Sequence, residues 1–212
     1  MPRIDDYKQA LNLGKIELSG RNPDLIARFS GSQIHRDKGG SLSLSLNFLN
    51  REVSLAWHDM AFSYRNSEEE LPIQQQILLL HYLQGAFASS GSAITGEWIA
   101  FQDVPDGKFY LDAFHRRAKI PMVQAFGDRP ELLVGLATNA YGAVPFDQGD
   151  ISVAVKALPL VPVALIIWRG DEEFPPEGNI LFDRNISDIL SAEDVAWLSG
   201  MVVYPLVGMA GK

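Results

Sequence analysis

The sequence contains no cysteine. Disulfide bonds, thiolate nucleophiles and cysteine-ligated zinc or iron–sulfur centres are therefore excluded within this chain. Positive charge is also scarce, because 18 lysine and arginine residues stand against 26 aspartate and glutamate residues, for a net charge of −8. Proteins that bind nucleic acid or anionic membrane surfaces need basic residues to neutralise phosphate. We therefore expect neither partner.

Several familiar sequence signals are missing as well. The chain has no P-loop, no hydrolase nucleophile elbow and no dinucleotide-binding glycine fingerprint. Its first residues show no basic segment followed by an apolar one, so no secretory signal is evident and we expect a cytoplasmic protein. Residues 195–210 carry no formal charge, but this stretch is shorter than the roughly 20 residues of a membrane-spanning helix. We expect a buried core helix there.

What remains is an ordinary globular composition. Of the 212 residues, 47% are hydrophobic and 21% are charged, which is enough to bury a sizeable core without disulfides. No internal repeat, low-complexity tract or interdomain linker is apparent. We therefore expect a single α+β domain over residues 1–212.

Hydrophobic periodicity switches along the chain between two residues and 3.6 residues, the periods of a strand and a helix. This predicts an antiparallel sheet with helices packed on one face and a buried C-terminal helix, in which Trp197, Leu198, Met201 and Val202 are largely buried. The expected strands are residues 41–48, 52–58, 151–157 and 162–168, and the expected main helices are residues 71–86 and 192–207.

A rigid acidic segment follows the most apolar run of the chain, residues 163–168. Asp171, Glu172 and Glu173 are consecutive, and two prolines then stiffen the backbone. Such carboxylates could bind a hard cation or act as an acid–base pair. The alternative is a solvated acidic turn, because neighbouring side chains on an extended segment point to different sides.

Two further groups are candidates for a site. His81 and Tyr82 lie on the expected helix, with His81 at the edge of its apolar face, where it could titrate near neutral pH or bind a ligand. Arg116 and Arg117 belong to the one basic cluster of the chain and could hold an anionic group bidentately. The alternatives are a satisfied histidine at the core boundary and a solvated helix face.

The chain resembles the family called domain of unknown function 3786. The resemblance rests on residues 80–83 (LHYL) and 170–175 (GDEEFP), with further matches at 95–98 (TGEW), 179–183 (NILFD) and 193–194 (ED). It implies a helical N-terminal extension over residues 1–30 and a family-like core over 31–212. The family is common in anaerobic bacteria and archaea, and cysteine-rich relatives imply metallocofactor or corrinoid metabolism. That association does not transfer directly to a chain without cysteine.

The leading hypothesis is a non-catalytic binding or accessory protein of anaerobic metabolism, for a small ligand or metal cofactor whose identity stays unknown. Its site is expected where the acidic segment meets the His81 helix, with ligand-binding residues His81, Tyr82, Arg116, Arg117, Asp171, Glu172 and Glu173. The alternatives are a metal-assisted hydrolase that uses the carboxylates of the acidic segment, and a protein-interaction module without a ligand site. We expect a carboxylate of the acidic segment to contact His81, Arg116 or Arg117, because a rigid carboxylate cluster needs a cation or a hydrogen-bond donor nearby.

Overall fold

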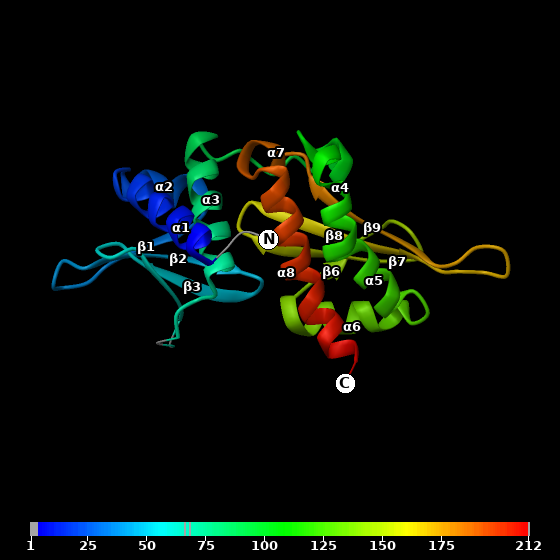
Figure 1. Cartoon of the computed structure of the whole chain (residues 1–212). Helices are drawn as coiled ribbons and strands as arrows, with labels where there is room; N and C mark the ends of the chain where they lie inside the picture. The colour runs from blue at the N-terminus through cyan, green and yellow to red at the C-terminus, as the bar shows by residue number, and fades with distance from the viewer. Residues whose placement is uncertain (1–3, 66, 68, 212) are drawn as a thin grey trace.

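The computed structural model describes residues 4–65, 67 and 69–211, which form two lobes side by side (Figure 1). The N-terminal lobe has three helices and an antiparallel sheet with strand order β1-β2-β3-β4. Its elements are α1 (Ile4–Ser19), α2 (Pro23–Ser30), β1 (Gln33–Arg36), β2 (Leu42–Phe48), β3 (Arg51–Ala56), β4 (Ala61–Tyr64) and α3 (Ile73–Ala88).

The C-terminal lobe contains a second antiparallel sheet, of five strands in the order β5-β9-β8-β7-β6. Its strands are β5 (Trp98–Ala100), β6 (Val144–Pro145), β7 (Ile151–Leu158), β8 (Val161–Trp168) and β9 (Glu177–Asp183). Its helical elements are η1 (Phe101–Asp103), α4 (Gly107–Phe114), the π-helical turn η2 (His115–Lys119), α5 (Ile120–Phe126), α6 (Pro130–Tyr141), α7 (Ile186–Ile189) and α8 (Ala192–Ala210).

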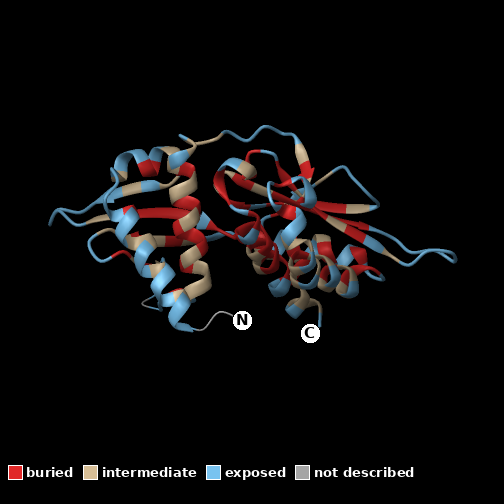
Figure 2. Cartoon of the chain, turned by 45° about the horizontal axis from the view of Figure 1, so that its top comes forward, coloured by how far each residue is buried: buried red, intermediate tan, exposed pale blue. Residues whose placement is uncertain are grey.

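The α+β class and the antiparallel pairing are confirmed, and the expected strands and main helices agree with the structure to within two or three residues at their ends. The strands are divided between two sheets, where a single sheet was described from the sequence. The expectation that residues 1–212 form one domain stays a prediction. Nearly all buried apolar side chains of both lobes belong to one continuous core, which lies along the strands and the helix faces that cover them (Figure 2).

Local sequence chemistry explains where the main helices begin. Asn22 accepts hydrogen bonds from the backbone N–H groups of Asp24 and Leu25, which caps α2. Ser191 and Asp194, three positions apart, form a reciprocal capping box at the start of α8. Helix α8 then packs against α3, α4, η2, α5 and α6, so it lies at the centre of the structure.

The burial of α8 is confirmed, but not for every expected side chain. Leu198 and Val202 are fully buried, whereas Trp197 and Met201 are only half-buried. Trp197 and Met201 keep part of their surface exposed because the apolar face of α8 borders a cavity on that side. None of the described helices is both long enough and apolar enough to cross a bilayer.

The two lobes meet along one side of α3. The hydroxyl of Tyr82 donates to the carbonyl of Ser30 (2.6 Å) and accepts from the backbone N–H of Leu160, in the turn between β7 and β8 (3.2 Å). One turn further along α3, Gly85 lies so close to α7 that a Cβ atom there would be 1.9 Å from the carbonyl oxygen of Ile189. Only glycine permits this approach.

A second set of bonds attaches the segment before β5 to the end of β9. The carboxylate of Asp183 is fully buried and accepts hydrogen bonds from the backbone N–H groups of Thr95, Gly96 and Asn185. Burial opposes ionisation of Asp183, but these hydrogen bonds outweigh it and lower the pKa of the carboxyl group. Glu97 and Arg184, which neighbour these residues in the chain, form a bidentate ion pair.

We predict that Gly85→Ala destabilises the protein by about 1–3 kcal/mol or more, since the added methyl group forces α3 and α7 apart. Intrinsic helix propensity alone would give the opposite sign, by roughly 1 kcal/mol. Urea denaturation of the two proteins measures the difference.

Gly135→Ala in α6 is the matched control, because nothing lies within 4 Å of the Cβ position there. This substitution should stabilise the protein by about 0.5–1 kcal/mol. Equal stabilisation by both substitutions would show that the two lobes do not depend on the approach at Gly85.

Candidate functional site

The acidic segment lies at the tip of the hairpin that joins β8 to β9, at the end of the C-terminal lobe that is remote from α3 (Figure 1). Asp171 Oδ1 accepts hydrogen bonds from the backbone N–H groups of Glu173 and Phe174, both at 2.8 Å. These bonds lower the pKa of Asp171. The side chains of Glu172 and Glu173 are exposed. The segment is therefore a turn closed by its own aspartate, as in the solvated-turn alternative.

The expected contact between the acidic segment and the basic candidates is not formed. Within the described part of the chain, no hydrogen bond or ion pair joins Asp171, Glu172 or Glu173 to His81 or to Arg116 and Arg117. The physical reason is local, because backbone N–H groups supply the donors that the Asp171 carboxylate needs.

His81 instead pairs with Asp194 at the N-terminus of α8, with 2.7 Å between Nδ1 and Oδ1. The other carboxylate oxygen of Asp194 accepts from the Ser191 hydroxyl at 2.6 Å. The hydrogen bond to Asp194 raises the pKa of His81, although partial burial of the imidazole opposes this. The pair links the two lobes, since α3 belongs to one and α8 to the other.

The remaining candidates have different surroundings. Tyr82 is fully buried and bonded at its hydroxyl, so it has a structural position and faces no ligand site. Arg116 is exposed. Arg117 lies with its guanidinium over the indole ring of Trp197, with 4.4 Å between Cζ and the ring centroid. Of the candidate residues, Arg117 alone lines the cavity between the two lobes.

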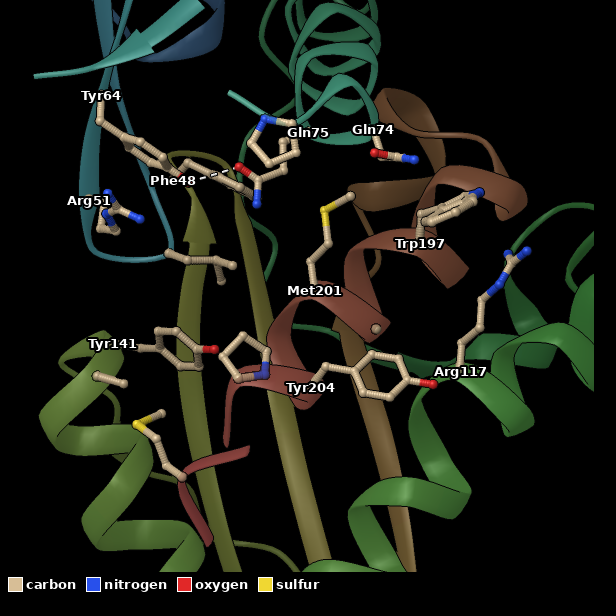
Figure 3. Close-up of a pocket in the computed structure, with 16 residues that line it drawn as sticks. Phe48, Arg51, Tyr64, Gln74, Gln75, Arg117, Tyr141, Trp197, Met201 and Tyr204 are labelled. Carbon is tan, nitrogen blue, oxygen red and sulfur yellow. Dashed lines mark hydrogen bonds between the residues drawn. The ribbon is translucent and has the colours of Figure 1, made fainter. Parts of the chain in front are cut away.

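A cavity of about 540 Å³, the interlobe pocket, lies between the β2–β3 hairpin, the start of α3, and the helices of the C-terminal lobe (Figure 3). Its walls are mainly apolar and aromatic. The lining residues are Phe48, Leu49, Arg51, Tyr64, Pro72, Gln74, Gln75, Arg117, Ala140, Tyr141, Trp197, Gly200, Met201, Tyr204, Pro205 and Met209.

Three departures from regular backbone structure meet at this pocket. Leu49 and Asn50 form the two-residue turn between β2 and β3, and Leu49 has a φ of 49°, in the left-handed region that favours glycine. Arg117 belongs to a π-helical turn, a feature that is often found at functional sites. Pro205 lies inside α8 and cannot donate a hydrogen bond to the carbonyl group of Met201.

These irregularities persist because neighbouring contacts hold them. The backbone N–H of Leu49 donates to the carbonyl of Ala157 in the other lobe (2.9 Å), and the Leu49 side chain is buried. The hydroxyl of Tyr141 donates to the carbonyl of Val202 (2.9 Å), and burial raises the pKa of this phenol. Gly200 of α8 lies beside η2, where a Cβ would make an ordinary contact with the Arg117 carbonyl oxygen at 3.4 Å. The pocket walls are therefore preformed.

The polar groups of the pocket are few and lie at its sides. Arg51 stacks on the ring of Tyr64, with 3.3 Å from Cζ to the centroid. The hydroxyl of Tyr64 donates to Gln75 Oε1 at 2.8 Å. Figure 3 shows Met201 in the middle, with Arg51 and Tyr64 on one side and Arg117 on the other. The arrangement can hold a flat apolar molecule and contact polar groups at its ends.

A smaller side pocket adjoins the interlobe pocket and contains the His81–Asp194 pair. The two cavities share Gln74 and Trp197 as lining residues. Within the described residues, Nδ1 is the imidazole nitrogen of His81 that has a hydrogen-bond partner. Among those same residues, no three histidine, aspartate or glutamate side chains are grouped so that they could hold a metal ion.

Sequence reasoning missed most of the interlobe pocket. Its residues come from segments far apart in the chain, and their clustering has no local signature. Two local signals were present, namely Pro205 within an uncharged helical stretch and the basic cluster that contains Arg117. Neither signal specifies a partner element.

The His81–Asp194 pair predicts a pH-dependent stability. The folded-state pKa of His81 is raised, so the stabilisation is fully present below the unfolded-state pKa of about 6.5 and is lost as the pH rises through the folded-state value. His81→Gln should therefore cost more stability at acidic than at alkaline pH, by at most about 1 kcal/mol because the imidazole is 41% exposed.

Urea denaturation of both proteins between pH 5.5 and 8.5 tests this prediction. In an Asp194→Asn background, the effect of His81→Gln should lose its pH dependence, because the charge partner is gone. A cost of His81→Gln that is the same at every pH, with Asp194 intact, would contradict the assignment.

Comparison with known proteins adds one match. The model of the family described as "Domain of unknown function (DUF3786)" matches residues 22–204, which include α2 and so begin before the expected family-like core at residue 31. No curated protein and no solved structure matches the chain. The matched range covers both lobes except α1 and the end of α8, and it includes the His81–Asp194 pair and nearly all of the interlobe pocket. The chain therefore belongs to the family described as domain of unknown function (DUF3786).

Proposed function

We propose that this protein binds a small organic molecule in the interlobe pocket and acts as a binding or accessory protein without catalysing a reaction. The observation that carries the proposal is the preformed cavity of about 540 Å³ at the junction of the two lobes. Pockets of roughly 300–1,000 Å³, lined by apolar and aromatic side chains with a few polar groups, are typical of small-molecule sites. A cytoplasmic location stays an expectation from the sequence.

The chemistry of the walls supports a ligand with a flat apolar body. Tyr64, Tyr141 and Trp197 supply aromatic surface, and the flexible thioether of Met201 can adapt to the shape of a ligand. Trp197 and Met201 are half-buried although they belong to the most apolar helix of the chain. A ligand in the pocket would cover the apolar surface that these side chains leave exposed.

The backbone irregularities around the pocket also support a function there. A left-handed leucine, a π-helical turn and a proline inside a helix each cost free energy, of order 1–3 kcal/mol. They come from separate elements, and they meet at one cavity. Sites where several local rules are broken together are expected to be functional or strained.

An enzyme remains the second candidate, and the side pocket favours it. The carboxylate of Asp194 holds Nδ1 of His81, which leaves Nε2 as a proton acceptor at the edge of the cavity. This is the geometry of a histidine general base. The Ser191 hydroxyl bonds to Asp194 and not to His81, so this cluster supplies no serine nucleophile. The acidic segment, in which Asp171 is satisfied by backbone donors, no longer favours the metal-assisted hydrolase.

We predict that the neutral apolar dye N-phenyl-1-naphthylamine binds the protein with a saturable rise in fluorescence. Met201→Trp should weaken this binding by about tenfold or more, because the larger side chain fills the middle of the pocket. Fluorescence titration measures both affinities.

Leu13→Trp is the matched control, because Leu13 is exposed on α1 and does not line the pocket. It adds a tryptophan of the same size and should leave dye binding unchanged. A protein that does not bind the dye, or that binds it equally in all three forms, would favour the interaction module without a ligand site.

A further inference from the structure

We infer that the ligand of the interlobe pocket is an organic anion, with a flat apolar body and at least one carboxylate or phosphate group that Arg51 or Arg117 holds. The inference rests on the proposed function and specifies the chemical class of its ligand.

Charge is the first argument. The chain has a net charge of −8, and acidic residues outnumber basic ones by 26 to 18. The described residues that line the interlobe pocket include two arginines, Arg51 and Arg117, and no aspartate or glutamate. A cavity lined only by positive charge, in a protein of strongly negative charge, attracts anions to that place and repels cations.

The bonding of the two guanidinium groups is the second argument. Elsewhere in the described chain, arginines such as Arg36 and Arg184 are paired with carboxylates, here those of Asp24 and Glu97. Arg51 and Arg117 have no carboxylate partner within the described residues and instead lie over aromatic rings. Stacking uses the face of the guanidinium plane and leaves the N–H groups at its edge available as donors. Those edges match the two oxygens of a carboxylate or phosphate.

The third argument is the position of a further donor. The Oε1 atom of Gln75 accepts the hydrogen bond from the Tyr64 hydroxyl. The Nε2 atom of Gln75 donates no hydrogen bond to another described residue. Gln75 and Arg51 both lie beside Tyr64 at one side of the pocket, while Arg117 lies at the opposite side (Figure 3). An acidic group at the first side can therefore receive bonds from a guanidinium and an amide, and one at the other side from Arg117.

The test compares two aromatic molecules of the same shape and different charge. Isothermal titration calorimetry with 2-naphthoate, an anion, and 2-naphthamide, its neutral isostere, measures both dissociation constants at low salt. We expect naphthoate to bind about tenfold more tightly or better, because a hydrogen bond to a charged group is stronger than one to a neutral group. The preference should shrink as salt screens the charges.

Charge-removing variants identify the arginine that is responsible. Arg51→Gln or Arg117→Gln should reduce the preference for naphthoate about tenfold and leave the affinity for naphthamide nearly unchanged. The matched control is Arg28→Gln, since Arg28 also lies over an aromatic ring, Phe29, but outside the pocket. It should change neither affinity.

The outcomes separate the two proposals. If naphthamide binds as tightly as naphthoate, or if both pocket variants keep the full preference, the anion inference is overturned and the pocket stands as a neutral apolar site. If neither molecule binds, the proposed function itself fails, and the inference fails with it.

Discussion

The close approach of α3 to the C-terminal lobe is the constraint on which the rest of the structure depends. His81, Tyr82 and Gly85 lie within one turn of that helix, and each makes a different kind of contact across the lobe boundary. The imidazole of His81 pairs with a carboxylate, and the phenol of Tyr82 accepts a hydrogen bond from a backbone N–H. Gly85 leaves room for a backbone carbonyl oxygen. Because the glycine has no side chain, the helix can come near enough for the other two residues to reach their partners.

The same approach explains why the interlobe pocket exists. At the end of α3 where Gly85 lies, the lobes are in direct backbone contact. At the start of α3, where Gln74 and Gln75 lie, the lobes diverge and the side chains of α8 are left partly uncovered. The hairpin between β2 and β3 closes the far side through Leu49, whose N–H bonds to Ala157. The cavity is therefore bounded by rigid elements, which favours binding without a large ordering cost.

The local sequence pattern is sufficient to predict the secondary structure, but it is not sufficient to predict the residues of the site. The alternation in residues 41–48 and the capping box at Ser191 act through neighbours in the chain, so the strand and helix starts could be predicted. The partner of His81 lies 113 positions away, and no periodicity specifies such a pair. The acidic segment misled in the opposite way, because Asp171 looks unpaired in the sequence, whereas backbone N–H groups of the same segment donate to its carboxylate. Arg117 was selected for its charge, and only the fold shows that it stacks on Trp197.

The attachment of Thr95 and Gly96 to Asp183 has a consequence for the order of folding. Nearly all strand pairs in both sheets join neighbours in the sequence, so their loops are short and close quickly. Strand β5 is different, because it pairs with β9, and the Glu97–Arg184 bond spans 87 positions. The helices α4, α5 and α6 lie between these two strands in the chain, together with β6, β7 and β8. We therefore expect the edge strand β5 to join its sheet late in folding, after the loop that contains those elements has closed, and to be fixed there by its hydrogen bonds to the buried Asp183 carboxylate.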